Sequence, residues 1–242
     1  MPAHVLILGC GRSGTSIFGE LFDHIDGYTY HSEPDFESVV EMSFEQPVAI
    51  KVPKESPRFL PTAGLSFPLD VMLETIPQPR MIYWQVRHPL DAIASLRVGI
   101  SKNWGHHPRP PDWKKWQHRP LVEQCAHHWN FINSVGYGQV QGLVEITRFE
   151  DMISDPFSFA AQVCEHIGVA VAAQRSELRC WSDRVQDTNN SQFVEARTSR
   201  AYSRPDHERR VDRWKENLSE AEAAQSAAIV RDAAATLGYE IP

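Results

Sequence analysis

The chain has 242 residues, of which 42% are hydrophobic and 23% are charged. These proportions are those of an ordinary globular protein, so they exclude a wholly disordered chain and allow a sizeable buried core. The 24 Lys and Arg residues are outnumbered by 31 Asp and Glu residues, for a formal net charge of −7, which argues against a general binder of nucleic acids or anionic membranes. An anionic ligand would have to be met by individually placed cations.

The cysteines and the apolar runs indicate the compartment. The four cysteines lie far apart and form no Cys-x-x-Cys pair, so neither a disulfide framework nor a zinc ribbon is indicated. No segment approaches the roughly 20 apolar residues of a membrane span, and residues 1–8 lack the cationic stretch and long apolar run of a secretion signal. We therefore expect a cytoplasmic protein without a membrane span.

Short apolar runs, each ending at a turn or a charged residue, predict the strands. They lie at residues 4–8, 48–52, 81–86 and 142–147, with a further strand expected just before Glu33. Apolar residues at helical spacing predict the helices. These cover residues 17–25, the segment from Pro89, residues 121–135, residues 156–167 and the segment opened by a capping box at Ser219 and Glu222. The alternation predicts an α/β fold with a parallel sheet flanked by helices, and we expect one domain over residues 1–242.

Two stretches lack this periodicity. Residues 101–120 interleave prolines with tryptophans and histidines, and we expect a long loop that is either functional or mobile. The adjacent His106 and His107, with Asp112 as the nearby carboxylate, fall short of a recognisable ligand spacing, so we predict no metal site. Residues 187–210 are polar and predict a flexible flap.

The strongest local pattern is the glycine-rich stretch at residues 9–16, between a predicted strand and a predicted helix. Its glycines allow backbone N–H groups to curl around an anion, and the helix start adds a positive dipole end. A Walker motif needs Lys directly before Ser or Thr, but here Thr15 follows Gly14 and the cation is Arg12. The pattern favours a phosphate cradle unlike that of an ordinary ATPase, with a ligand-free glycine-rich turn as the structural alternative.

A second candidate anion site lies at Arg87, where a predicted strand ends. Ser95 follows about two turns into the next predicted helix. Two separate anion sites suit a nucleotide with phosphates at both ends. Taken alone, Arg87 is as consistent with a structural salt bridge and Ser95 with a solvated hydroxyl, so the hypothesis depends on the glycine-rich stretch.

Four segments, in order, resemble the signatures of sulfotransferases that use 3′-phosphoadenosine-5′-phosphosulfate. They are residues 11–15, 86–95, 148–156 and 213–218, within a resemblance that extends from Val5 to Tyr239. The resemblance implies a parallel sheet flanked by helices, related to nucleotide kinases. It also implies transfer of a sulfuryl group to an acceptor hydroxyl and release of adenosine 3′,5′-bisphosphate, without a metal.

The resemblance also implies which residues bind the nucleotide. The glycine-rich stretch would hold the 5′-phosphosulfate, through Gly11, Arg12, Ser13, Gly14, Thr15 and Ser16. Arg87 and Ser95 would hold the 3′-phosphate, and a basic stretch near the C-terminus would close over the 3′-phosphate and adenine. This stretch contains Arg209, Arg210, Arg213, Trp214 and Lys215. Which arginine makes the contact stays open, because Asp212 stands where Gly is common in the family; a solvated basic face is the alternative. Phe149 stands where many relatives have Tyr.

Relatives that act on carbohydrates or protein tyrosines carry a catalytic Glu at about the place of Glu33, which the resemblance therefore implies as the general base. A carboxylate beside bound substrate accepts the acceptor's proton if burial raises its pKa, whereas an exposed loop Glu is the alternative. His31 is a competing or assisting base, on the same side of its strand. Lys51 and Arg12 would neutralise the charge that develops. Pro53 stands where cytosolic small-molecule enzymes have a catalytic His.

The acceptor is left open by the residues: a carbohydrate, a lipid, a phenol, a peptide tyrosine or another small molecule. We expect a small-molecule or carbohydrate partner and no nucleic acid, with residues 101–120 on the acceptor side, where Trp104, Trp113 and Trp116 either line the cleft or anchor the loop. A kinase using ATP and Mg²⁺, or a catalytically silent nucleotide-binding protein, are the alternatives. The oligomeric state stays open.

Overall fold

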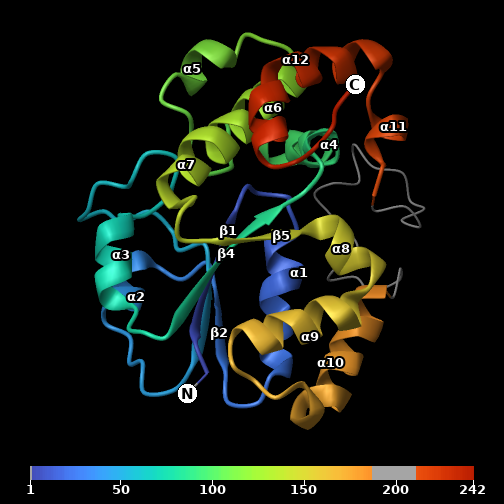
Figure 1. Cartoon of the computed structure of the whole chain (residues 1–242). Coiled ribbons are helices and arrows are strands. Elements are labelled where there is room, and N and C mark those ends of the chain that lie inside the picture. Colours follow the sequence, from blue (N-terminus) through green and yellow to red (C-terminus); the bar gives the residue numbers. More distant parts are fainter. Residues whose placement is uncertain (1, 187–210) are drawn as a thin grey trace.

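A computed structural model describes residues 2–186 and 211–242 of the chain (Figure 1). The predicted flap at residues 187–210, which includes Arg209 and Arg210, lies outside the described residues. Within the described ranges, no helix is both long enough and apolar enough to cross a membrane.

The centre of the fold is a five-stranded sheet in the order β2-β3-β1-β4-β5, and every pair in it is parallel. The strands are β1 (His4–Gly9), β2 (Thr29–Ser32), β3 (Val48–Lys51), β4 (Arg80–Val86) and β5 (Glu145–Arg148). Leu6 of β1 lies opposite Ile50 of β3 and Ile82 of β4. The central strands are continuous apolar runs because helices cover both faces of the sheet. The predicted α/β class is confirmed.

Helices bury the two faces of the sheet in separate cores (Figure 1). The core that contains Leu6, Ile50 and Trp84 packs under α2 (Phe36–Val40), α3 (Leu69–Thr75), α4 (Pro89–Ile100), α6 (Leu121–Phe131) and α12 (Glu220–Thr236). The core that contains Val5, Ile7 and Tyr83 packs under α1 (Thr15–Glu20), the short helix Leu21–His24, α8 (Phe149–Ser154), α9 (Pro156–His166) and α10 (Val171–Gln186). Figure 1 shows α12 beside α6 and α4.

The helix ends show why these segments are helical. Pro89 and Pro156 each occupy the first turn of a helix, where a missing N–H costs nothing. The Asp155 carboxylate accepts a hydrogen bond from the Ser158 amide at 3.0 Å and caps α9. Ser219 and Glu222 form the predicted capping box at the start of α12.

Some boundaries differ from the predictions. The predicted helix at residues 121–135 is α6, which runs on through a π-helical turn (Ile132–Gly136) into α7 (Tyr137–Val140). Residues 101–120, predicted as a loop, include one short helix, α5 (Trp113–Trp116). Further helices were not predicted: α2, α3, α8 and α11 (Trp214–Asn217) are too short to show a period, and α10 presents only a narrow apolar face.

Candidate active site

Parallel strands bring the predicted site residues to one edge of the sheet, because their carboxyl ends all point the same way. The glycine-rich stretch, residues 9–16, follows β1 and is called the anion loop from here on. Glu33 follows β2, Lys51 ends β3 and Arg87 follows β4. Four segments that are distant in sequence therefore converge at this edge.

Close approaches explain the glycines of the anion loop. Gly9 has φ +148°, and a Cβ there would lie 2.4 Å from the carbonyl oxygen of Gln85. Gly14 has φ +87°, and a Cβ there would lie 2.4 Å from the ring of Phe149. The loop is thus pressed against β4 on one side and α8 on the other, which leaves no space for a side chain at either position.

A buried ammonium joins the anion loop to Glu33. Lys51 Nζ lies 2.7 Å from Glu33 Oε1 and 2.9 Å from Ser16 Oγ. The Lys51 side chain is 4% exposed, whereas that of Glu33 is 57% exposed, so one end of the ion pair is fixed in the protein and the other faces solvent. Glu33 is thus exposed, as in the alternative considered for it, and only a bound acceptor would cover its carboxylate. Glu33 has a left-handed backbone, with φ 51°, and its N–H donates to the Lys51 carbonyl at 2.9 Å. This conformation turns the Glu33 side chain out of the strand.

His31 does not join this cluster. It lies on β2 opposite Ile50 of β3, and no hydrogen bond or ion pair connects it to Glu33 within residues 2–186 and 211–242. The positive φ of Glu33 breaks the strand alternation that placed the two side chains on the same side.

The two predicted anion sites form one continuous network. Arg12 Nε donates a hydrogen bond to Ser95 Oγ at 2.9 Å, and Arg87 Nη1 donates to the Arg12 carbonyl at 3.2 Å. The guanidinium of Arg87 also lies 4.4 Å from the ring centroid of Phe149. Arg87 and Ser95 are each 6% exposed. The Phe149 ring, which packs on Gly14 as well, links the second site to the anion loop.

Residues 212–214 of the C-terminal basic stretch are held beside this network by Asp91 of α4. The Asp91 carboxylate accepts hydrogen bonds from the Asp212 amide at 2.9 Å and the Trp214 amide at 2.8 Å, and Arg213 between them is buried. Burial raises the pKa of Asp91, and the Arg87 charge opposes this shift. Asp212 has φ 64°, the left-handed conformation that Gly adopts most readily.

Aromatic rings complete this side of the site. Trp214 stacks on His88, with ring centroids 6.0 Å apart and an interplanar angle of 7°. Trp214 Nε1 and His88 Nδ1 are buried and have no hydrogen-bond partner among the residues that the structure describes. Burial lowers the pKa of His88, which favours a neutral ring against the indole.

A cavity of about 480 Å³ opens beside Glu33 and the anion loop. Its lining includes Gly9, Gly11, Thr15, Glu33, Val52, Pro53, Lys54, Glu55, Ser66, Gly105, His106 and His107. Residues 101–120 thus reach the site through Gly105, His106 and His107. His106 and His107 were not predicted as site residues, because adjacent histidines in a proline-rich loop form no recognisable motif.

The tryptophans of residues 101–120 anchor that segment and do not line this cavity. Trp104 is 1% exposed, and its indole donates to His128 Nδ1 at 3.2 Å. Trp116 stacks on His127 at 4.0 Å and donates to Asp112 at 3.0 Å. Of the two roles considered for these residues, the structure supports the anchoring one.

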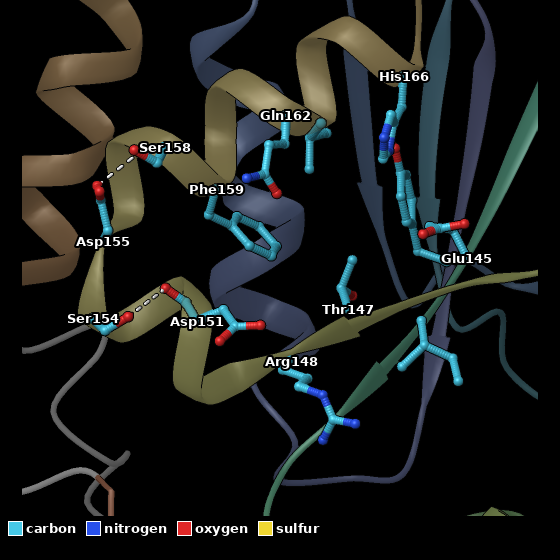
Figure 2. A pocket seen from close by; sticks show the side chains of 13 residues that line it. Glu145, Thr147, Arg148, Asp151, Ser154, Asp155, Ser158, Phe159, Gln162 and His166 are labelled. Carbon is cyan, nitrogen blue, oxygen red and sulfur yellow. Dashed lines mark hydrogen bonds between the residues drawn. The ribbon is translucent and has the colours of Figure 1, made fainter. Parts of the chain in front are cut away.

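A second cavity, of about 270 Å³, lies at the β5 edge of the sheet. Figure 2 shows Glu145 and Thr147 of β5 across from Phe159 and Gln162 of α9, with the Asp155–Ser158 cap at one side. None of the predicted site residues lines it. Across the described part of the chain, no group of three or more His, Cys, Asp or Glu side chains is placed to hold a metal ion.

Comparisons with known proteins bear on the family and the fold. The family model described as "Sulfotransferase domain" matches residues 2–238. No curated protein matches the chain significantly.

Three solved structures share the fold at low identity. Mouse sulfotransferase SULT7A1 complexed with PAP is 13% identical, with 96% of this chain and 84% of that chain covered and a TM-score of 0.59. The sulfotransferase domain from the curacin biosynthetic pathway is 14% identical, with coverages of 100% and 99% and a TM-score of 0.62. Retinol dehydratase in complex with androsterone and inactive cofactor PAP is 15% identical, with coverages of 100% and 84% and a TM-score of 0.55.

Proposed function

The chain belongs to the sulfotransferase domain family, and from this premise we propose that it transfers a sulfuryl group to a hydroxyl of an acceptor bound in the 480 Å³ cavity. The family uses 3′-phosphoadenosine-5′-phosphosulfate as the donor. When bound, this nucleotide supplies the sulfuryl group already activated on a phosphate oxygen. The remaining work, binding the donor, orienting the acceptor and moving one proton, falls to residues of this chain.

The anion loop suits the 5′ end of such a donor. Ser13 Oγ is buried without a hydrogen-bond partner among the described residues, and a buried hydroxyl of this kind is normally paired. Arg12 lies in the loop and Lys51 contacts it at Ser16, so both supply positive charge to it. Residues 11–16 would therefore hold the 5′-phosphosulfate, and the two cations would stabilise the negative charge that develops on its oxygens.

The network around Ser95 suits the 3′-phosphate. Arg87, Ser95 and Arg213 are all buried. Arg12 joins the first two, because its Nε donates to Ser95 and its carbonyl accepts from Arg87. Arg213 precedes Trp214, whose amide donates to Asp91 of the same helix as Ser95. The stacked Trp214 and His88 lie beside them, with unpartnered ring nitrogens for a polar base edge. Selection of a 3′-phosphorylated adenosine over ATP would follow from this second group of cations, because ATP carries no phosphate at the 3′ position.

The observation that carries the proposed mechanism is the contact of Lys51 with both Glu33 and Ser16. It places a carboxylate, an ammonium and the anion loop together at one wall of the cavity. Glu33 Oε accepts the acceptor's hydroxyl proton while the acceptor oxygen forms its bond to sulfur, and the donor phosphate oxygen leaves with the bonding electron pair. We assign His31 no role in this step, since no hydrogen bond or ion pair joins it to Glu33 among the described residues.

The acceptor that we propose is a small molecule or a carbohydrate unit. A cavity of about 480 Å³ is of the size that holds small ligands in proteins. Its lining combines Glu33, Glu55 and His107 with apolar groups such as Val52 and Pro53. A hydroxylated molecule with both polar and apolar faces matches these walls.

Titration calorimetry tests donor binding. The full chain should bind adenosine 3′,5′-bisphosphate without divalent ions and should bind ATP much more weakly. Mg²⁺-dependent ATP binding, with no binding of the bisphosphate, would instead indicate a kinase and overturn the proposal.

Transfer is tested with radiolabelled donor and a panel of hydroxylated acceptors. The Glu33→Gln variant should lose about a hundredfold or more of its turnover, the usual range for removing a general base, and keep its affinity for adenosine 3′,5′-bisphosphate within about threefold. Glu41→Gln, an exposed position after α2, is the matched control and should transfer like the wild type. Full transfer by Glu33→Gln would remove Glu33 from the mechanism.

A further inference from the structure

His106 occupies a space that two glycines keep open for it. A Cβ at Gly11 of the anion loop would lie 2.9 Å from His106 Nδ1, and a Cβ at Gly99 of α4 would lie 2.2 Å from His106 Nε2. The imidazole is therefore held between the anion loop and α4, with its Nδ1 edge against Gly11. Both Gly11 and His106 line the 480 Å³ cavity.

A second histidine lies directly behind this ring. The ring of His128 is 5.9 Å from that of His106, at an interplanar angle of 34°. His128 is 0% exposed, and its Nδ1 accepts the indole N–H of Trp104 at 3.2 Å. A nitrogen that accepts a hydrogen bond carries no proton, so the proton of the neutral His128 ring is on Nε2.

Each of the two rings has one buried nitrogen without a hydrogen bond among the described residues. His128 Nε2 and His106 Nε2 are both buried, and neither has a hydrogen-bond partner in the described part of the chain. Leaving a buried donor and a buried acceptor unpaired is expensive. A rotation of the rings that lets His128 Nε2–H donate directly to His106 Nε2 would satisfy both atoms.

Both histidines are neutral around pH 7. Burial lowers the pKa of His106 to about 4, with a further contribution from the Arg12 charge. Burial also lowers the pKa of His128 far below its ordinary value. A neutral ring that accepts at Nε2 must carry its proton on Nδ1, the nitrogen that faces Gly11.

We propose that Trp104 and His128 fix His106 as the tautomer with its proton on Nδ1, so that His106 donates a hydrogen bond to a sulfate or phosphate oxygen held by the anion loop. His128 is then a positioning residue, and His106 is the residue that contacts the anion. The inference rests on the proposed function, since it needs an anion in the loop. It adds a neutral donor at Gly11 of the loop, without adding another positive charge beside Arg12.

Nitrogen-15 NMR of the histidine-labelled full chain reads the tautomer directly. The His106 signals are identified by their loss in His106→Asn. At pH 7 we expect a protonated Nδ1 and an unprotonated Nε2, and we expect the Nδ1 signal to move when adenosine 3′,5′-bisphosphate is added. A proton on Nε2 would overturn the inference and indicate that His106 acts as a hydrogen-bond acceptor or base.

His128→Asn tests the relay itself. The Asn side chain keeps an acceptor near the former Nδ1 for the Trp104 indole but removes Nε2. His106 should then become a mixture of both tautomers. An unchanged His106 spectrum in this variant would show that His128 does not set the tautomer.

A pair of substitutions separates donation from packing. Asn has an amide donor close to the position of Nδ1, whereas Leu has a similar size and no donor. His106→Leu should weaken the binding of adenosine 3′,5′-bisphosphate by about tenfold or more, as expected for a lost hydrogen bond to a charged group. His106→Asn should stay within about threefold.

The outcomes also separate the two proposals. Equal losses in the Leu and Asn variants would assign His106 a packing role and overturn the inference while leaving the proposed function intact. If the wild type itself fails to bind the bisphosphate in calorimetry, the proposed function fails and this inference fails with it. If His106→Leu does not fold, the tautomer spectrum of the wild type still decides.

Discussion

Arg12 Nε donates a hydrogen bond to Ser95 Oγ at 2.9 Å, which ties the anion loop to the second turn of α4 across 83 positions of sequence. The Arg12 carbonyl accepts from Arg87 in the same place. The guanidinium of Arg12 is thus oriented by the helix that also carries the proposed 3′-phosphate site. Because Arg12 takes part in both anion sites, binding of a phosphate group at one site should order the other.

Ser95→Ala removes the acceptor for Arg12 Nε. We expect the affinity for adenosine 3′,5′-bisphosphate to fall about tenfold, the usual scale for a hydrogen bond that involves a charged group. Turnover at saturating donor should fall less, because the cavity and Glu33 are untouched. Calorimetry and steady-state kinetics measure the two effects. Ser101→Ala, which removes a hydroxyl bonded to the Val98 carbonyl at the end of the same helix, is the matched control. An unchanged affinity in Ser95→Ala would contradict the assignment.

Gly14→Ala tests the contact between the anion loop and Phe149. Gly14 and Gly27 have similar backbones, with φ +87° and φ +84°, but a Cβ at Gly27 would meet nothing within 4 Å. Gly27→Ala should therefore cost only the left-handed backbone strain, about 1 kcal/mol in the free energy of unfolding. Gly14→Ala should cost roughly 1–3 kcal/mol more, because its methyl overlaps the Phe149 ring.

Urea denaturation of the two glycine variants measures this difference. Gly14→Ala should also weaken binding of adenosine 3′,5′-bisphosphate, since Phe149 supports Arg87 as well. Equal unfolding free energies for the two variants would mean that the loop moves freely away from α8.

A feature of this molecule could be predicted when the residues that determine it are neighbours in the sequence. Strands β1, β3 and β4 were predictable because each is a largely buried apolar run, and the anion loop was predictable because its glycines and Arg12 lie within a few positions of one another. The position of His106 was not, because it depends on a contact with Gly11, which is distant in sequence, and on the close approach of Gly99 of α4. The sequence also did not predict that His31 and Glu33 point in different directions. Side chains alternate along a strand only while the backbone stays extended, and Glu33 has φ 51°.

The contacts of the C-terminal segment also could not be predicted from the local sequence. Asp212 replaces a residue that is commonly Gly in the family, which made the nearby contacts uncertain from sequence. The structure gives Asp212 a left-handed backbone and ties its amide to Asp91. Asp212 therefore adopts the backbone conformation of a glycine, held by the buried carboxylate of Asp91. No local pattern around Asp212 predicted this contact.

Asp91→Asn tests that anchor. The substituted amide group cannot accept from both backbone N–H groups of Asp212 and Trp214, and its own NH₂ faces one of them. Affinity for adenosine 3′,5′-bisphosphate should fall about tenfold, because hydrogen bonds to a charged carboxylate are among the stronger ones. Asp70→Asn, an exposed position in the first turn of α3, should bind normally. Wild-type affinity in Asp91→Asn would show that the anchor does not support the binding site.

The buried histidines make stability depend on pH. Burial lowers the pKa of His106 to about 4, where the Arg12 charge adds to the shift and the Glu33 charge opposes it, and burial also lowers the pKa of His128 well below its ordinary value. In the unfolded chain both rings titrate near pH 6.5. Below that pH the unfolded state therefore binds more protons than the folded state, and protonation favours unfolding.

The free energy of unfolding should be constant with respect to these two groups well above pH 6.5 and should fall as the pH decreases toward 4. Each histidine that stays neutral in the folded state contributes a slope of up to about 1.4 kcal/mol per pH unit. Denaturant unfolding at a series of pH values between 7.5 and 4.5 measures this slope. His106→Asn should reduce the proton uptake on unfolding at pH 5 by close to one proton. His118→Asn, at an exposed histidine, should leave the slope as it is in the wild type. An unchanged slope in His106→Asn would mean that this ring gains its proton without unfolding, in which case it is not held neutral between Gly11 and Gly99.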